Sequence, residues 1–299
     1  PGAIGDSLLA LPVLQALRKQ YNATHITYVS NPAVLPLARA WEVADEVSDF
    51  ERPYWGKIFL PGRWPSALQQ EGAIKQPVDM AICWLPDPEG IVEANMRAAG
   101  IAPVIVAPGR PSRDERIHIV EYLARTAGLH VMFQNFPWPP SALIQPAVPV
   151  PSSPRIALHP GSGGAVKCWP VASYAALIRE LWQREVPVLL LAGPAEHERL
   201  AELRHLLGSP HRPELLEYLV DAPLLVVAQY LVACRGYLGN DTGITHLAAM
   251  LGLPTLVLFG PSDPQIWRPI GPAVSVLQAS SLPQLPVATV LTHLEKYLL

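Results

Sequence analysis

The chain has 299 residues, half of them hydrophobic, which is enough for two domains of about 150 residues with a core each. Its formal net charge is −3 and its basic residues are scattered, so nothing in it resembles a nucleic-acid footprint. Cys83, Cys168 and Cys234 are widely spaced, which argues against a zinc site or a disulfide framework. Because neither a signal peptide nor a membrane-spanning apolar run is found, we expect a cytoplasmic protein with reduced cysteines.

The first half alternates apolar strand patterns with helical patterns, which is typical of an α/β domain. We expect buried strands at 25–30, 78–85 and 104–107 and helices at 8–20, 89–99 and 115–127.

A glycine-rich turn opens the chain and leads into the first helix, with Asp6 where the two meet. A carboxylate at this point is either a helix cap or a base that faces a cleft, and the residues alone leave both interpretations open. Because a strand should precede such a turn, we expect one ahead of Gly2.

Residues 52–64 combine arginine, lysine, tryptophan and tyrosine in one loop. We hypothesise that this loop contacts a substrate or a bilayer surface through Trp55 and Trp64. The alternative is an ordinary loop that its aromatic side chains anchor. Loss of vesicle binding on changing both tryptophans would support the first interpretation, and unchanged binding would support the second.

Repeated prolines between residues 137 and 154 can neither continue a helix nor join a central strand, so they predict an interdomain linker. We place an N-terminal domain at 1–149 and a C-terminal domain at 150–299. The last helix, at about 287–299, is expected to pack back on the N-terminal domain.

The second half again alternates strands and helices, and its strand patterns suit a parallel sheet. We expect strands at 155–159, 186–192, 237–238, 255–259 and 274–277, and helices at 171–184 and 224–234.

A glycine-rich turn with a single lysine, Lys167, follows the first strand of this half and leads into the helix at 171–184. Beside a helix N-terminus, this cation could neutralise a leaving diphosphate. The spacing is not that of a Walker A loop, and Gly161, Gly163 and Gly164 do not form the GxGxxG dinucleotide fingerprint. A solvated lysine is the alternative.

Glu196 follows the next strand, close to the place where a ribose could bind. An acidic residue in the first turn of a helix is the competing interpretation. Glu198, two residues further on, is a second candidate for the same role.

A polar segment between an apolar strand and an apolar helix, Gly239–Ala249, is the third turn of this kind. The free backbone N–H groups at such a helix N-terminus favour a diphosphate, and Thr242 and Gly243 let the backbone approach it closely. Alternatively, Asp241 or Thr242 simply caps the helix.

These segments together resemble glycosyltransferase family 9, the heptosyltransferase-like bacterial enzymes that build lipopolysaccharide core and related surface glycans. The resemblance implies an α/β fold of the GT-B type, with two Rossmann-like domains whose parallel sheets face a central cleft. The first domain would hold the acceptor and the second the nucleotide sugar. The matching blocks, in the family's order, are Gly2–Pro12, His159–Ser162 with Lys167–Pro170, Gly239–Gly243 with His246–Ala248, and Phe259–Pro264.

The resemblance also implies roles for single residues. Asp6 would be the catalytic base, and Lys167 would be the charge partner of the donor diphosphate. Asp241 would orient the sugar, while His246 matches the motif and could equally support the loop. The other implied donor-binding residues are Ser162, Gly163, Glu196, Thr242 and Gly243.

The chemistry follows from these roles. An acceptor hydroxyl is a poor nucleophile, so a carboxylate must take its proton as the new bond forms. Attack and departure on opposite faces of the anomeric carbon imply inversion. The chain has no Asp-x-Asp pair for a Mg²⁺-bridged diphosphate, so we expect a metal-independent reaction and no cofactor.

The expected partners are a nucleotide-sugar donor, with ADP-heptose implied by the resemblance, and a glycan or lipid-linked glycan acceptor. A lipid-linked acceptor would be met at the inner face of the cytoplasmic membrane, so we expect peripheral contact there. Two alternatives stay open. A GT-B-like nucleotide-sugar epimerase should carry extra acid/base residues, and a catalytically silent nucleotide- or glycan-binding protein should lack the base, against which Asp6 in its motif argues.

Overall fold

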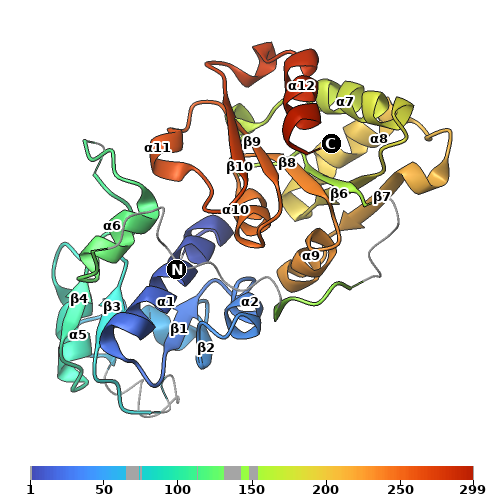
Figure 1. Cartoon of the computed structure of the whole chain (residues 1–299). Coiled ribbons are helices and arrows are strands. Elements are labelled where there is room, and N and C mark those ends of the chain that lie inside the picture. The colour runs from blue at the N-terminus through green and yellow to red at the C-terminus, as the bar shows by residue number, and fades with distance from the viewer. Residues whose placement is uncertain are drawn as a thin grey trace. The chain divides into compact units, whose positions relative to one another are not determined.

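The computed structural model describes residues 2–64, 74, 76–112, 114–130, 143–147 and 154–298. The chain divides into two compact units, Pro1–Pro137 (unit 1) and Trp138–Leu299 (unit 2), and each is α/β (Figure 1). The boundary predicted at residues 149/150 and most of the proline linker lie outside the described residues, so that boundary stays a prediction.

Unit 1 contains the strands and helices that the sequence predicts, together with short elements that it does not. The first helix begins earlier than expected, because the apolar pattern already starts within the glycine-rich turn. The elements are α1 (Ile4–Tyr21), β1 (Thr27–Ser30), α2 (Leu35–Ala40), β2 (Glu46–Asp49), α3 (Pro53–Gly56), β3 (Ala81–Cys83), α5 (Ile91–Ala98), β4 (Val104–Val106) and α6 (Ile119–Thr126).

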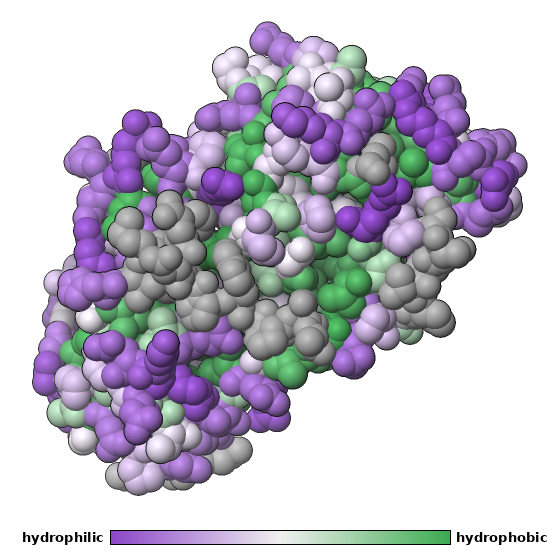
Figure 2. Space-filling model, in the orientation of Figure 1, coloured by the Kyte–Doolittle hydropathy of each residue, from purple (hydrophilic) through white to green (hydrophobic). Residues whose placement is uncertain are grey.

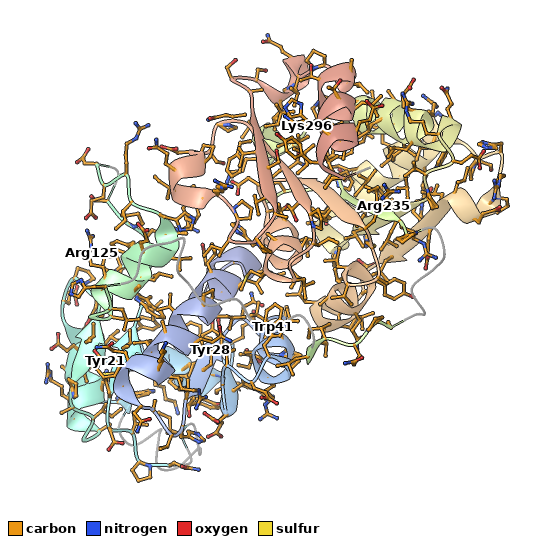
Figure 3. All side chains as sticks on the ribbon, in the orientation of Figure 1. Tyr21, Tyr28, Trp41, Arg125, Arg235 and Lys296 are labelled. Carbon is orange, nitrogen blue, oxygen red and sulfur yellow. The ribbon has the colours of Figure 1, made fainter. Side chains whose placement is uncertain are left out.

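Helix α1 is the central helix of unit 1, and its middle turns are buried on most sides. It packs against α6 and is tied to β1 by Tyr28, whose hydroxyl donates a hydrogen bond of 2.8 Å to the carbonyl of Ser7 (Figure 3). The helix ends at Asn22, which adopts the left-handed conformation common at helix C-termini. Asp6 lies in the first turn of α1, so the packing of this helix fixes the position of its backbone.

The strands of unit 1 form two parallel pairs, β1 with β2 and β3 with β4. In the part of the chain that the structure describes, no ladder joins the two pairs. A cavity of about 1190 Å³ lies beside both, and residues of β1 and β3, together with Asp6 and Arg110, line it. The strand expected ahead of Gly2 stays a prediction.

The hypothesis that Trp55 and Trp64 contact a bilayer surface is wrong, because both indoles belong to the core of unit 1. Contact of this segment with an acceptor stays a prediction. Trp55 is 3% exposed and Trp64 is 1% exposed, and their ring centroids lie 5.8 Å apart. The indole N–H of Trp55 donates to the hydroxyl of Ser48 at 2.9 Å. Burying rings of this size stabilises the unit more than exposing them would, so these two side chains anchor the loop.

Unit 2 contains all five strands expected in it, and one more. Its elements are β5 (Ile156–His159), α7 (Val171–Gln183), β6 (Val188–Ala192), α8 (His197–Leu207), β7 (Leu216–Val220), α9 (Leu224–Leu231), β8 (Gly236–Asn240), α10 (Gly243–Met250), β9 (Thr255–Phe259), α11 (Pro264–Trp267), β10 (Val274–Gln278) and α12 (Val287–Tyr297).

The six strands of unit 2 form one parallel sheet in the order β10-β9-β8-β5-β6-β7. Helices α7, α8 and α12 cover one face, and α9 and α10 cover the other (Figure 1). Because both faces are covered, the central strands are buried along their whole length. The strand order changes direction between β5 and β8, and ligands bind at such switch points in open α/β sheets.

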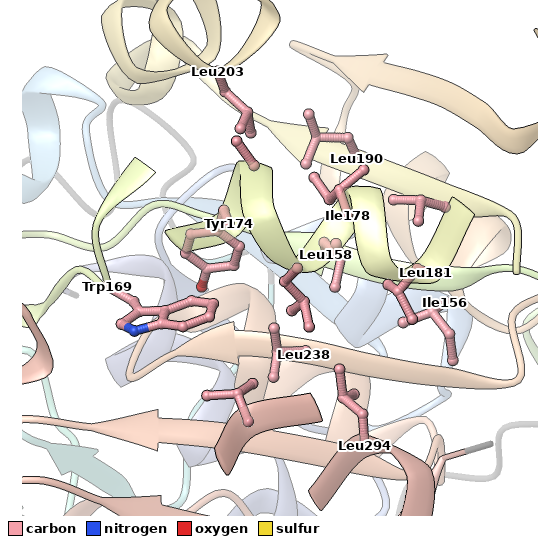
Figure 4. Close-up of a cluster of buried hydrophobic side chains, with 14 of the residues drawn as sticks. Ile156, Leu158, Trp169, Tyr174, Ile178, Leu181, Leu190, Leu203, Leu238 and Leu294 are labelled. Carbon is pink, nitrogen blue, oxygen red and sulfur yellow. The ribbon is translucent and has the colours of Figure 1, made fainter. Parts of the chain in front are cut away.

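The core of unit 2 lies between the sheet and helices α7, α8 and α12 (Figure 4). Trp169 and Tyr174 meet edge to face in it, with ring centroids 5.0 Å apart and planes at 72°. The Trp169 indole also donates to the carbonyl of Leu285 at 3.0 Å. The fixed indole ties the segment before α7 to the core, and Lys167 lies in that segment.

The last helix, α12, packs within unit 2 against α7 and β9. Arg235 donates to the carbonyl of Leu298 at 3.1 Å and so ties the end of α12 to the start of β8 (Arg235 is labelled in Figure 3). The expected contact of this helix with the first domain stays a prediction.

On the face that Figure 2 shows, the surface over α8 and the loop before β7 is predominantly hydrophilic.

Candidate functional site

Two of the predicted turns meet at the switch point of the unit 2 sheet. Strands β5 and β8 are neighbours in register, with His159 opposite Gly239. The turn after β5 leads through a short 3-10 helix, Ala165–Lys167, into α7, and the turn after β8 leads into α10. Since the carboxyl ends of parallel strands share one edge, the two turns lie side by side there.

An ion pair and a hydrogen bond join the two turns. The ammonium of Lys167 lies 2.8 Å from the Oδ2 atom of Asp241, and their side chains are 39% and 8% exposed. The hydroxyl of Ser162 donates to the backbone carbonyl of Asp241, also at 2.8 Å. Lys167 thus presents a positive charge at the surface of the site while Asp241 supports it from below.

Thr242 and Gly243 lie at the start of α10, which runs over eight residues to Met250. Thr242 has extended backbone angles and its side chain makes no capping hydrogen bond, so the predicted cap by this residue is not formed. The first turn of α10 holds no acidic residue. The first backbone N–H groups of a helix have no intrahelical partner, so the positive end of α10 is open to an anion.

Glu196 lies against the turn after β5, at the start of α8. Its Oε2 atom accepts a 2.8 Å hydrogen bond from the N–H of Gly193 and lies 3.7 Å from Nε2 of His159. Burial opposes ionisation of this carboxyl, but the nearby His159, with the N–H of Gly193 and with Arg199, outweighs burial and lowers its pKa. An ionised, buried carboxylate is therefore held beside the turn.

Gly161 makes this close approach feasible. A Cβ atom at this position would lie 2.2 Å from Cγ of Glu196, which no real side chain tolerates. Gly163, in contrast, is exposed and a Cβ atom there would meet nothing within 4 Å. The glycine-rich turn is therefore tightly packed at its start and open at its tip.

The structure distinguishes the two glutamate candidates and describes the surroundings of His246. Glu196 is 8% exposed and contacts the turn, while Glu198 is an exposed residue on α8. His246 lies in α10 and is 3% exposed, which places its ring in the interior and not at the surface of the turn. This burial fits the loop-supporting interpretation.

Asp6 lies in unit 1, in the first turn of α1, apart in sequence from the other predicted site residues. Its Oδ2 atom forms a 2.8 Å ion pair with the guanidinium of Arg110, and the Asp6 side chain is 28% exposed. Within unit 1, both residues line the cavity beside β1 and β3.

Sequence reasoning missed four residues that support the predicted ones. Arg110 pairs with Asp6, His159 faces Glu196, and Arg199 donates to the carbonyl of Trp169 at 2.8 Å. Asn240, fully buried at the end of β8, bonds to two points of the segment between β5 and α7. His159 and Asn240 end strands at the switch point, which is a signal that could have found them, whereas no local pattern marks Arg110 or Arg199.

Within the described ranges, no group of three or more His, Cys, Asp or Glu side chains could hold a metal ion. The three cysteines are free, and burial raises the pKa of the Cys83 thiol to about 11 and that of Cys234 to about 12. No helix in the described part of the chain is both long and apolar enough to cross a bilayer.

Solved structures with a similar fold include two heptosyltransferases. The ADP-heptose lipopolysaccharide heptosyltransferase II of E. coli superposes with a TM-score of 0.75 at 21% identity, covering 99% of this chain and 96% of that one. E. coli heptosyltransferase WaaC with ADP gives 0.75 at 19% identity, covering 99% and 97%. These likenesses define the fold as GT-B, an α/β class with parallel sheets, as predicted.

The family follows from the sequence matches. Residues 135–298 match the model of glycosyltransferase family 9 (heptosyltransferase), and the chain belongs to that family. Lipopolysaccharide heptosyltransferase 2 of Salmonella typhimurium is 29% identical over 126 residues, 42% of this chain and 36% of that protein. Lipopolysaccharide heptosyltransferase 1 of Pseudomonas aeruginosa is 35% identical over 115 residues, 38% of this chain and 31% of that protein. The matches span about a third of these relatives' own length.

Proposed function

We propose that the protein is an enzyme that transfers a sugar from a nucleoside diphosphate donor to lipopolysaccharide or another cell-surface glycan. The observation that carries this proposal is the Lys167–Asp241 pair beside the N-terminus of α10. A cation and free helix N–H groups at one place suit a leaving diphosphate. The matched relatives are named heptosyltransferases, and neighbouring structures contain ADP or ADP-heptose, which supports ADP-heptose as the donor.

In this proposal the diphosphate lies against Lys167 and the N–H groups of Thr242 and Gly243. Negative charge develops on the diphosphate as the bond to the sugar breaks, and preorganised donors stabilise it. Ser162 and Gly163 line the turn, Asp241 orients the sugar, and His246 supports the loop from its buried position. Glu196 is the ribose ligand, because a buried carboxylate beside the turn has a free oxygen to accept from hydroxyl groups.

Asp6 is the base in this proposal. Its carboxylate takes the proton of the acceptor hydroxyl as that oxygen attacks the anomeric carbon, a contribution worth about 10²–10⁴-fold. The ion pair with Arg110 fixes the orientation of the carboxylate. Attack on one face and departure of the diphosphate from the other invert the anomeric configuration.

We also propose that the reaction needs no metal, since Lys167 and the α10 N-terminus supply the positive charge on the diphosphate. Transfer should then be unchanged by EDTA and should gain nothing from added Mg²⁺ or Mn²⁺. Loss of activity in EDTA that a single metal restores would contradict this part of the proposal.

The test is a transfer assay with ADP-heptose and a series of truncated lipopolysaccharide acceptors. We expect ADP release only when a suitable acceptor is present, and an NMR spectrum of the product that shows the inverted anomeric bond. Release of ADP without an acceptor would favour the epimerase alternative. Tight ADP binding with no release under any condition would favour the silent binding protein.

A lipid-linked acceptor would require peripheral contact with the inner face of the cytoplasmic membrane. Because Trp55 and Trp64 are buried, we propose that Phe59 and Leu60 make this contact, as they are 42% and 51% exposed. Vesicle flotation should show binding by the wild type that the F59S/L60S variant loses. Equal flotation of both proteins would remove this contact from the proposal.

A further inference from the structure

Asn240 is a fully buried residue that bonds to both of the chain segments on either side of Lys167. Its side-chain amide donates to the carbonyl of Pro160 at 3.1 Å and to that of Gly161 at 3.0 Å. Its Oδ1 atom accepts from the N–H of Trp169 at 3.0 Å. Both amide hydrogens and the carbonyl are therefore used, so one side chain joins the end of β8 to two points of the neighbouring turn.

These bonds enclose the segment that carries Lys167. Pro160 and Gly161 lie ahead of this segment and Trp169 follows it, so Asn240 holds both of its ends. The Trp169 indole is itself fixed in the core (Figure 4). The lysine is a long side chain, 39% exposed, and the place of its ammonium depends on where the segment starts and ends.

The backbone of the same residue also holds the partner of Lys167 in place. Asp241 is the next residue in the chain, and its carboxylate lies 2.8 Å from the ammonium. The backbone carbonyl of Asn240 accepts a hydrogen bond from the hydroxyl of Thr245, which holds the first turn of α10 to the same point. The positions of Lys167, Asp241 and the α10 N-terminus therefore all depend on one buried residue, Asn240.

We propose that Asn240 is a positioning residue for the donor diphosphate and acts through Lys167. The inference rests on the proposed function of this turn as the donor site. Asn240 is buried and does not touch the diphosphate; it sets the distance between the ammonium and the open N–H groups of α10. An alanine at this position leaves two backbone carbonyls and one N–H unpaired in the interior and frees the lysine segment.

The test is a double-mutant cycle on ADP binding, measured by calorimetry with the full chain. We expect Asn240→Ala to weaken ADP binding about tenfold, a typical size for coupled residues. In a Lys167→Ala background, the same substitution should cause little further weakening, because the residue through which it acts is gone. Equal weakening in both backgrounds, or none in either, would overturn the inference.

The chain provides a matched control for loss of fold. Asn95 in unit 1 is 2% exposed and makes the same three bonds, donating to the carbonyls of Ile58 and Leu60 and accepting from the N–H of Gly62. Asn95→Ala should lower the melting temperature as Asn240→Ala does, yet leave ADP binding unchanged. Equal loss of ADP binding in both variants would reduce Asn240 to a structural residue and overturn the inference.

Two further arms separate the possible failures. If Asn240→Ala does not fold, the cycle is repeated with Asn240→Ser, which keeps one hydroxyl at the buried point and is expected to show the same non-additivity. If the wild type does not bind ADP at all, the proposed donor site fails, and the positioning role fails with it. If the wild type binds and only Lys167→Ala weakens binding, the donor site stands and the role of Asn240 is refuted.

Discussion

Lys167 is the residue on which the electrostatics of the two turns depend. Its ammonium is compensated by Asp241, a half-exposed cation paired with a largely buried anion. Solvent screens the attraction between the two charges only weakly on the side of the buried Asp241. On the exposed side, the ammonium of Lys167 is within reach of a ligand. Asp241 therefore holds the ammonium in place while its exposed part stays open to an anionic ligand.

Replacing Lys167 with alanine should weaken ADP binding about 10- to 150-fold, since a hydrogen bond to a charged group contributes roughly 1.5–3 kcal/mol. Calorimetry measures the change. Lys296→Ala, which removes the same charge from the exposed surface of α12, should bind ADP as the wild type does. Wild-type affinity in the Lys167 variant would show that the diphosphate does not lie against this turn.

Asp6→Asn should lower kcat by about 10²–10⁴-fold while ADP affinity stays unchanged, because the amide keeps the shape but cannot take a proton. Steady-state transfer assays and calorimetry give the two quantities. Asp45→Asn is the matched control, since Asp45 also pairs with an arginine of unit 1, Arg18, at 2.6 Å. If both variants lose activity equally, the effect reports the stability of unit 1 and not base catalysis.

Glu196 predicts how the stability of the protein depends on pH. Its pKa is lower in the folded protein than in the unfolded chain, because His159, Gly193 and Arg199 outweigh the opposing effect of burial. The carboxylate thus contributes stability above the ordinary carboxyl pKa, and this contribution is lost as the pH falls through the lower folded value.

His159→Gln removes the main group that lowers the pKa of Glu196, so the acid unfolding transition should move to higher pH. Melting curves recorded between pH 7 and pH 3 follow the shift. His205→Gln, at an exposed position of α8, serves as control and should behave as the wild type. An unmoved acid transition in the His159 variant would contradict the role given to this pair.

Among the elements, the turn after β5 is the most demanding in its geometry. Gly161 leaves no room for a Cβ atom against Glu196, whereas a Cβ atom on Gly164 would meet nothing within 4 Å. Both residues belong to the same turn, and neither has a positive φ angle, so the two differ in the space around them and not in backbone strain.

Gly161→Ala should therefore displace Glu196 and destabilise the fold by about 1–3 kcal/mol, the usual range for overpacking. The melting temperature should fall by several degrees and ADP binding should weaken, as thermal unfolding with and without ADP will show. Gly164→Ala should change neither quantity. A Gly161 variant with wild-type stability and affinity would mean that Glu196 has room to move without cost.

The central strands and the helices that follow the turns could be predicted from the sequence, because their apolar patterns are continuous. Strand β7 was missed, since it is half-buried along its length at the edge of the sheet and its hydrophobic signal is diluted. Helix α8 was missed because charged residues interrupt its apolar face. Edge elements are set by the packing around them, which a local pattern does not record.

The parts of the candidate site that a local sequence pattern marks could be predicted, whereas the contacts between residues far apart in the sequence could not. Strand–turn–helix seams mark Lys167 and Asp241, but the two are 74 residues apart in sequence and their pairing appears only in the fold. Asp6 and Arg110 are 104 residues apart, and nothing in the pattern around Arg110 indicates its partner. The buried tryptophans at 55 and 64 show the opposite error, in which an aromatic, basic loop suggests a surface that the fold has turned inward.

At the level of the whole molecule, the proposed function divides its residues between the two units. Unit 2 carries every residue proposed for the donor, around one switch point, and unit 1 carries the proposed base with its arginine. Donor binding should therefore depend on unit 2 alone, and catalysis on both. This division explains why Asp6→Asn is expected to spare ADP affinity while Lys167→Ala is not.

The central claim, that the two turns of unit 2 bind a nucleoside diphosphate sugar, is tested most directly by calorimetry with a panel of nucleotides and nucleotide sugars. We predict tight binding of one nucleoside diphosphate and its sugar, with ADP-heptose the expected donor, and loss of that binding in both Lys167→Ala and Asp241→Ala. Absence of binding to every nucleotide in the panel, by wild-type protein that is shown to be folded, would contradict the account.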